Sequence, residues 1–240
     1  MFTSVLWKPD FFCLSLRISD FLSTFAGQNL TMSTYTEDQW LAWIDELSEN
    51  DYVVIDNFLF DKILQKIEHF FKEKQAEDDF HKASIGPATD SKIISEIRGD
   101  YTFWLDKKRD QELDEFFELI QETIAKLNRY CYLSLTDFEF HLAYYPKGSY
   151  YHKHLDQFNN RSNRLISFII YLNENWKEGD GGELKVYKDS GDVIVAPLYN
   201  RAILFKSGDV PHEVLMTHKG RRSVTGWLLY QPAGLGYLLG

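Results

Sequence analysis

The sequence is poor in cysteine and short of basic residues. Its two cysteines, Cys13 and Cys131, lie far apart, which argues against a disulfide framework and against a CxxC metal or redox site. We therefore expect a reducing compartment and a cytoplasmic location. The 26 basic residues stand against 36 acidic ones and give a net charge of −10. No nucleic acid partner is expected, because phosphate binding needs a basic face.

Long apolar runs are absent as well. No stretch approaches the roughly 20 apolar residues needed to cross a bilayer, so no membrane partner is expected. The N-terminus lacks a basic start and a clear cleavage site, which argues against a signal peptide. We expect Met32 to be the working start, residues 1–31 to be a poorly ordered extension, and residues 32–240 to form a single domain.

The first part of that domain, residues 36–130, has mainly helical patterns. A capping box at Thr36 predicts the start of one helix. Apolar stripes predict two more, over about 61–74 and about 110–129. Residues 82–100 have no such period and contain Gly and Pro, so they predict a long surface loop that is a candidate lid.

From residue 136 the pattern changes to short apolar runs separated by turns. Strands with this spacing are typical of a sandwich or barrel. The sequence therefore predicts an α+β fold, with N-terminal helices packed on one side of a double-stranded β-helix (jelly-roll) core over residues 136–231. The predicted strands lie within residues 137–145, 150–156, 164–173, 183–188, 192–197, 201–206 and 223–231.

The stretch 150-YYHKHLDQ-157 contains His152, His154 and Asp156 at alternate positions. In a strand, all three side chains would point to the same side. Two histidines and one carboxylate form the ligand set of non-haem Fe(II) oxygenases, and His212, in a later strand-like segment, offers a third ligand. Polar residues that alternate by coincidence are the plainer interpretation.

The alternating stretch also resembles the HxHxDH signature of metallo-β-lactamase-type zinc hydrolases, with Gln157 in place of the last histidine. A downstream pair, Arg221 and Arg222, favours the oxygenase instead. An enzyme that uses 2-oxoglutarate must hold a carboxylate, and the guanidinium fork matches that group. Because strand side chains alternate, only one of the two arginines points inward with the metal face.

From Tyr145 to Trp227 the sequence resembles the 2-oxoglutarate and Fe(II)-dependent prolyl hydroxylases of the hypoxia-sensing type and their bacterial relatives. Several motifs in the same order are far more specific than a lone HxD. The matching pieces are 97-IRGDYTFWL-105, 144-YYPKGSYYHKHLD-156, 164-RLISFIIYLN-173, 181-GGELKVY-187, 211-PHEV-214 and 221-RRSVTGW-227.

This resemblance implies a role for each matched position. The Fe(II) ligands are expected to be His154, Asp156 and His212, so His152 is not a ligand. For the cosubstrate 2-oxoglutarate, Arg221 and Tyr171 are expected to bind the far carboxylate, Tyr145 to lie near the metal-chelating end and Leu184 to wall the pocket, which leaves Arg222 outward. The residues expected to border the substrate groove are Arg98, Asp100, Trp104 and Arg164. A surface ion pair between Arg164 and Asp100 is the alternative for those two.

The expected activity is hydroxylation of a protein or peptide, at a prolyl residue, with release of succinate and CO2. Fe(II) and 2-oxoglutarate are the expected cofactor and cosubstrate, with ascorbate as a further candidate. The same chemistry on a free amino acid or small metabolite is one alternative, because a fold does not fix a substrate. Two more distant alternatives are a metallo-β-lactamase-like zinc hydrolase and a jelly roll that only binds a partner.

Overall fold

The computed structural model describes residues 35–83, 98–157 and 163–230. The expected extension over residues 1–31 lies outside the described residues, as does most of the predicted lid. The elements are α1 (Glu37–Asn50), β1 (Tyr52–Ile55), α2 (Asp61–Ala76), β2 (His81–Lys82), β3 (Tyr101–Trp104), the 3-10 helix η1 (Gln111–Leu113), α3 (Asp114–Cys131), β4 (Leu135–Tyr145), β5 (Tyr151–His154), β6 (Arg164–Tyr171), β7 (Leu184–Val186), β8 (Val193–Val195), β9 (Ala202–Lys206), β10 (His212–Val214) and β11 (Arg221–Tyr230).

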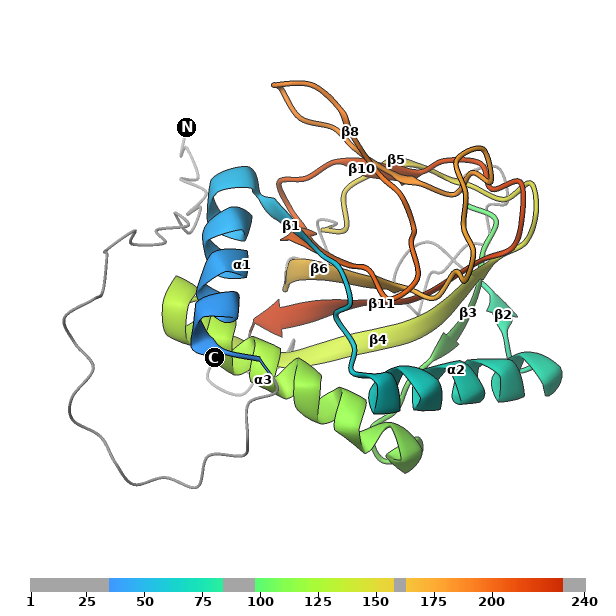
Figure 1. The fold of residues 1–240 in the computed structure, drawn as a ribbon, viewed down its shortest axis with the longest axis horizontal. Coiled ribbons are helices and arrows are strands. Elements are labelled where there is room, and N and C mark those ends of the chain that lie inside the picture. Colours follow the sequence, from blue (N-terminus) through green and yellow to red (C-terminus); the bar gives the residue numbers. More distant parts are fainter. Residues whose placement is uncertain (1–34, 84–97, 158–162, 231–240) are drawn as a thin grey trace, which may run out of the picture.

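The strands form two antiparallel sheets that face one another (Figure 1). The larger sheet has seven strands in the order β1-β9-β6-β11-β4-β3-β2, and the smaller has four in the order β5-β10-β7-β8. In Figure 1, α2 and α3 lie on the side of the larger sheet that faces away from the smaller one. This arrangement confirms the predicted jelly-roll core with helices on one side.

Local signals explain where the helices begin. The Thr36 hydroxyl accepts a hydrogen bond from the Gln39 N–H at 3.3 Å, and the Gln39 side chain accepts one from the Thr36 N–H at 3.0 Å, so the predicted capping box is present. The start predicted near Asp110 differs, because the first turn there is the 3-10 helix η1. The Asp110 carboxylate accepts from the Asp106 N–H of the preceding loop instead of capping the helix.

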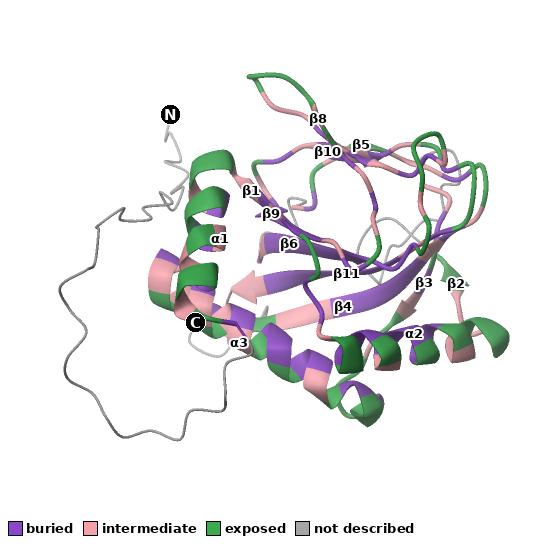
Figure 2. Ribbon diagram, viewed as in Figure 1, coloured by how far each residue is buried: buried purple, intermediate pink, exposed green. Residues whose placement is uncertain are grey.

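The larger sheet separates two apolar clusters, because side chains alternate between its faces. On β11, Val224 and Leu228 belong to the cluster that α1, α2 and α3 cover. On β6, Phe168 lies in that cluster, whereas its neighbour Ile169 belongs to the second cluster, inside the barrel between the sheets. Figure 2 shows the central strands of the larger sheet as largely buried and the outward faces of the helices as exposed.

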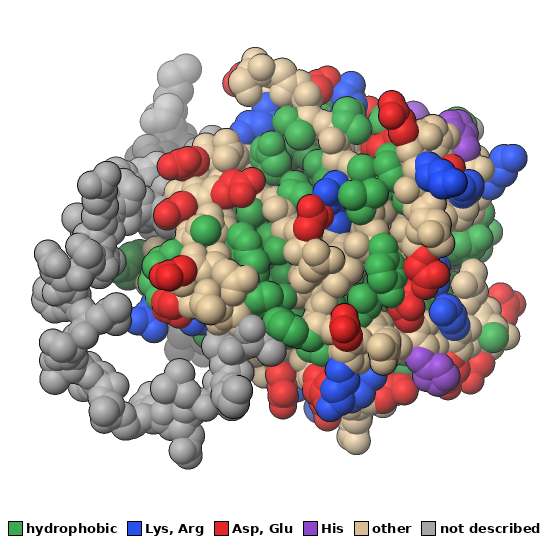
Figure 3. Space-filling model, viewed as in Figure 1, with side chains coloured by type: hydrophobic (Ala, Val, Ile, Leu, Met, Phe, Trp, Pro, Cys, Tyr) green, Lys and Arg blue, Asp and Glu red, His purple; other side chains and the backbone are tan. Residues whose placement is uncertain are grey.

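Two surface properties bear on the sequence-based expectations. Acidic and basic side chains are interspersed over the described residues on the face seen in Figure 3. Among the described residues, no helix combines the length and the apolar character required to cross a membrane.

His141 lies on the barrel side of the larger sheet and is fully enclosed. It is 3% exposed, and its ring packs against Trp104 and Trp227 at centroid distances of 4.8 and 5.5 Å. Burial lowers the pKa of His141 from 6.5 to about 3, with a further contribution from the Arg98 guanidinium. The imidazole is therefore neutral at physiological pH.

We expect Phe168→Ala to lower the free energy of unfolding by about 3–5 kcal/mol, because it leaves a cavity in a packed core. The Phe168 ring contacts Phe58 and Phe140 at centroid distances of 5.2 and 5.8 Å. Chemical denaturation measures the change. Ile194→Ala is the control, since Ile194 is 53% exposed, and an equal loss in both variants would contradict this description of the core.

The buried, neutral His141 should make the protein less stable in mild acid. An unfolded chain binds a proton at this histidine below about pH 6.5, whereas the folded chain resists it down to about pH 3. The folded state therefore loses about 2 kcal/mol relative to the unfolded state between pH 7 and pH 5. In His141→Phe that part of the pH dependence should vanish in denaturation curves at the two pH values. Identical slopes in the two proteins would show that His141 is not buried as described.

Candidate metal centre

Three potential metal ligands converge between β5 and β10. His154 ends β5, Asp156 follows two residues later, and His212 begins β10. Antiparallel pairing places His212 directly opposite His154. One ligand atom from each of the three residues lies within 4.8 Å of the others. His154 Nε2 is 3.5 Å from Asp156 Oδ1, and His212 Nε2 is 3.6 Å from Asp156 Oδ2.

Backbone carbonyl groups fix how the two imidazoles are turned. His154 Nδ1 lies 2.7 Å from the His152 carbonyl oxygen, and His212 Nδ1 lies 3.0 Å from the Val210 carbonyl oxygen. Since a carbonyl only accepts, either ring, when it has a single N–H, carries that proton on Nδ1 and keeps the Nε2 lone pair for a metal. Both Nε2 atoms then face Asp156.

The protonation states also suit a cation. Burial lowers the pKa of His212 to about 4, although Asp156 opposes this. For Asp156, burial alone would raise the pKa, but His212, His154 and the Ser167 hydroxyl outweigh it and hold the pKa well below its usual range. At neutral pH the site therefore presents a carboxylate and a neutral His212 imidazole, which is the form that ligates Fe(II) or Zn(II).

His152 lies outside this cluster. Its side chain is exposed, and its ring lies beside Tyr150 at a centroid distance of 4.7 Å. The residue that made the stretch conspicuous contributes only its backbone carbonyl, which holds His154.

Arg221 enters the barrel from the start of β11 and is 3% exposed. Its Nε donates to the Gly182 carbonyl at 2.9 Å, and one terminal nitrogen donates to Ser223 Oγ at 3.3 Å. Its guanidinium carbon lies 4.8 Å from the ring centre of Tyr145 and 5.1 Å from that of Tyr171. Gly182 leaves the space that it needs, because a Cβ there would lie 3.0 Å from Arg221 Cδ.

Two buried polar groups, the Arg221 guanidinium and the Tyr171 hydroxyl, lie on neighbouring side chains in the barrel. Within the described residues, no carboxylate lies within ion-pair distance of Arg221, whereas the other deeply buried cations Arg98, Arg164 and Lys206 each pair with a carboxylate. The Tyr171 hydroxyl is also buried, and among the described residues the Arg221 guanidinium is the polar group nearest to interact with it. Since a buried charge is costly without a partner, this pair fits an anionic ligand such as a carboxylate.

Arg222 points to the opposite face, as strand alternation requires. Its side chain is only partly exposed, because it packs against Phe71 of α2. There it donates to the Leu172 carbonyl at 2.9 Å and lies 3.8 Å from the Glu68 carboxylate. Its place is thus structural, on the helical side of the sheet.

Tyr145 and Leu184 lie inside the barrel. Both belong to the buried cluster inside the barrel, with Tyr171. Burial raises the pKa of the Tyr145 hydroxyl, so this group stays protonated and can donate a hydrogen bond. Leu184 is fully buried on β7 and supplies an apolar wall.

Of the four candidate groove residues, Arg98 and Asp100 pair with each other, Arg164 pairs with a carboxylate outside the set, and Trp104 is an exposed aromatic residue. Arg98 makes two hydrogen bonds to Asp100, at 2.7 and 2.5 Å. Arg164 pairs with Glu139 at 2.5 Å and covers the Trp227 ring at 3.5 Å. Asp100 and Arg164 thus have other partners than the surface pair considered above. Both arginine side chains are thus paired with a carboxylate.

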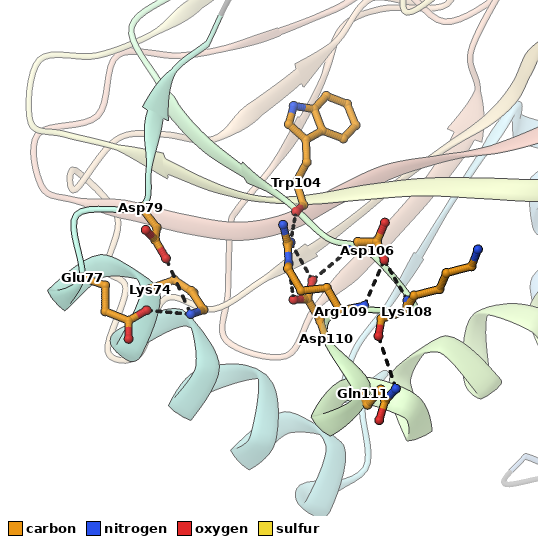
Figure 4. A network of polar contacts seen from close by, with 9 residues as sticks. All are labelled: Lys74, Glu77, Asp79, Trp104, Asp106, Lys108, Arg109, Asp110 and Gln111. Atoms are coloured by element: carbon orange, nitrogen blue, oxygen red, sulfur yellow. Dashed lines mark hydrogen bonds and ion pairs between the residues drawn. The ribbon is translucent and has the colours of Figure 1, made fainter.

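Trp104 is 47% exposed, and a polar network holds its backbone (Figure 4). Arg109 donates to the Trp104 carbonyl oxygen at 2.6 Å and pairs with Asp110 at 2.6 Å. The Asp106 carboxylate accepts from the backbone N–H groups of the same turn. In Figure 4 the indole points away from this network, so an exposed aromatic surface is held in a fixed place.

Residues that the sequence patterns did not identify complete the site. The Tyr151 ring stacks on that of His154 at a centroid distance of 3.6 Å, and the Arg98 guanidinium lies over the Tyr151 ring at 4.5 Å. Ser167 and Ser207 are buried next to Asp156. The available signal was a small polar residue within an otherwise apolar predicted strand, which applies to Ser167 but not to Ser207.

Comparisons with known proteins agree with this geometry. Residues 140–229 match the model of the 2OG-Fe(II) oxygenase superfamily. The Caenorhabditis elegans hypoxia-inducible factor prolyl hydroxylase is 27% identical over 215 residues, which cover 78% of this chain and only 27% of that protein. Human prolyl hydroxylase EGLN3 is 26% identical over 192 residues, which cover 75% of this chain and 79% of that protein.

Solved structures give the same result. A Pseudomonas putida prolyl-4-hydroxylase is 31% identical with a TM-score of 0.70, and the match covers 80% of this chain and 100% of that one. A Trichoplax adhaerens prolyl hydroxylase, solved with a hypoxia-inducible factor peptide fragment, shares the fold at 24% identity and a TM-score of 0.73, over 82% of this chain and 94% of that one. The chain therefore belongs to the 2OG-Fe(II) oxygenase superfamily, as a prolyl hydroxylase-like dioxygenase that depends on Fe(II) and 2-oxoglutarate.

Proposed function

We propose that this dioxygenase hydroxylates a prolyl residue in a protein or peptide and releases succinate and CO2. The observation that carries the proposal is the buried Arg221 guanidinium, which has no carboxylate partner among the described residues and lies in the same barrel as a three-ligand metal cluster. A cosubstrate with a carboxylate at each end would satisfy both features. The 31% identity to the P. putida prolyl-4-hydroxylase supports the prolyl substrate.

We propose roles for seven residues of the barrel. His154, Asp156 and His212 would hold Fe(II), and their one-sided arrangement leaves positions for the keto acid and dioxygen. Fe(II) with 2-oxoglutarate and dioxygen supplies the oxidising chemistry when bound. Arg221 and Tyr171 would bind the far carboxylate and so fix the cosubstrate's orientation. Tyr145 and Leu184 would line its pocket and exclude water.

The substrate groove is proposed to include Arg98, Asp100, Trp104 and Arg164. The support is two contacts: Arg98 covers Tyr151, which stacks on His154, and Arg164 covers Trp227. Paired charges and aromatic surfaces suit an uncharged ring and a peptide backbone better than a free, zwitterionic amino acid. Turnover of a free amino acid or small metabolite is the second candidate.

We also propose a domain organisation and a cellular location for the protein. The helices and the barrel would form one dioxygenase domain, since the helices cover one face of the larger sheet and the barrel interior lies against the other. We also propose a cytoplasmic location and no nucleic acid or membrane partner. The support is the acidic composition and the cysteine usage.

The cosubstrate role of Arg221 can be tested against its neighbour. In Arg221→Ala, the 2-oxoglutarate concentration needed for half-maximal succinate release should rise about 10- to 100-fold, because a charged hydrogen-bond donor is lost. Arg222→Ala is the matched control on the other face and should change this concentration little. If Arg222→Ala had the larger effect, the proposed assignment of the two arginines would be wrong.

Binding can be separated from turnover. The wild-type protein with Fe(II), kept free of oxygen, should gain a visible absorption band when 2-oxoglutarate is added, and His212→Ala should not. A wild-type protein that shows no band and releases no succinate in air would refute the oxygenase function. Zinc-dependent hydrolysis that survives Arg221→Ala would instead support the hydrolase alternative.

The prolyl substrate is tested by mass spectrometry. Proteins from host cells that lack the gene are incubated with the enzyme, Fe(II) and 2-oxoglutarate, and a proline-containing peptide should gain the mass of one oxygen atom. The His212→Ala enzyme is the control. Succinate release driven by free amino acids, without any modified peptide, would favour the second candidate.

A further inference from the structure

The carboxylate of Asp156 is held by two buried serine hydroxyls outside the ligand cluster. Ser167 Oγ lies 2.6 Å from Asp156 Oδ2, and Ser207 Oγ lies 2.8 Å from Ser167 Oγ. Ser167 is 1% exposed and Ser207 is 0% exposed. Two short hydrogen bonds in such a dry place are strong and sensitive to geometry.

The direction of both bonds follows from the number of protons. An ionised carboxylate only accepts, so Ser167 must donate its single hydroxyl proton to Asp156 Oδ2. Ser207 must then be the donor in the bond between the two serines. The result is a one-way chain from Ser207 through Ser167 to Asp156, in which each hydroxyl has one possible role.

Ser207 also joins the segments that carry the ligands. Its carbonyl oxygen accepts from the Asp156 N–H at 3.2 Å, and its own N–H donates to the Leu165 carbonyl at 3.0 Å. Ser207 directly follows β9 and begins the connection that leads to His212 at the start of β10. Ser207 therefore fixes both the backbone and, through Ser167, the side chain of Asp156.

A hydrogen bond to one carboxylate oxygen matters for a metal site of this kind. Two histidines and one singly bound carboxylate leave three coordination positions open. A carboxylate that turned to bind through both oxygens would fill one of these positions. The Ser167 hydroxyl takes up one of the two lone pairs of Oδ2 and opposes that turn. Although Oδ2 lies 3.6 Å from His212 Nε2, the oxygen without this hydrogen bond is Oδ1, 3.5 Å from His154 Nε2, which makes Oδ1 the better metal ligand.

We propose that Ser167, supported by Ser207, is a positioning residue that limits Asp156 to one metal-binding oxygen and so keeps a position open for the cosubstrate. The inference rests on the proposed function, since it assumes that the three ligands hold the metal. In addition to the three ligands, the site would then require a hydroxyl group at position 167 that accepts a hydrogen bond from the buried Ser207 hydroxyl.

The test uses Co(II), added alone to the metal-free full chain and followed by its visible absorption. Ser167→Ala should weaken Co(II) binding about 10- to 100-fold, the usual effect of losing a group that orients a ligand. It should also reduce the change in the Co(II) spectrum when 2-oxoglutarate is then added. Ser207→Ala should shift both measurements in the same direction by less, and Ser167→Thr, which keeps the hydroxyl, should restore them.

Thr123→Val is the matched control. It removes another fully buried hydroxyl, which donates to the Leu119 carbonyl within α3, and should leave Co(II) binding unchanged. Melting temperatures of all variants show whether a loss of binding is only a loss of folding, and the Ser207→Ala result stands if Ser167→Ala is unstable.

The outcomes separate this inference from the proposed function. Wild-type protein that binds Co(II) and responds to 2-oxoglutarate, with a folded Ser167→Ala variant that does the same at equal affinity, would overturn the inference and leave the function intact. A wild-type chain that binds no Co(II) would overturn both. Equal losses in Ser167→Ala and Thr123→Val would also overturn the inference, because the effect would then belong to any buried hydroxyl.

Discussion

The strict alternation of side chains across the larger sheet is the constraint on which the rest of the structure depends. Each central strand supplies apolar residues to the helical side and a mixture of polar and apolar residues to the barrel side. A shift of one residue would exchange these sets, placing Arg221 under the helices and Val224 in the barrel. The fit of helices to the outer face therefore fixes the register that forms the site, although the helices cover the face opposite the barrel interior.

The same constraint explains how much the sequence could predict. The spacing of His154 and Asp156 is local, so a short pattern revealed it. Strand alternation implied that only one of Arg221 and Arg222 points inward, and the resemblance to the family identified Arg221 as that residue. The fold class could be predicted because helical and strand patterns occupy separate halves of the chain, and the capping box at Thr36 was visible as two residues three apart.

Other features depend on contacts that no local pattern contains. The pairing of His212 with His154 joins residues that are far apart in sequence. The strand-like segment around His212 made it a candidate third ligand, and the resemblance to a family supported that choice, but neither showed which strands pair. The Ser207 hydroxyl lies in a turn, where serine is common, so nothing marked it as a neighbour of Asp156. The ion partners of Arg98 and Arg164 likewise depend on which strands meet, and a polar residue on one strand does not indicate its partner on another.

The direct pairing of His154 with His212 has a consequence for folding. β5 and β10 are only four and three residues long, too short to hold together well through backbone hydrogen bonds alone. A metal ion bound by both histidines would cross-link β5 and β10 at the position where His154 and His212 are paired. Binding of this kind stabilises the folded chain. The stability of the smaller sheet, and with it the closure of the barrel, would therefore rise with the concentration of available iron.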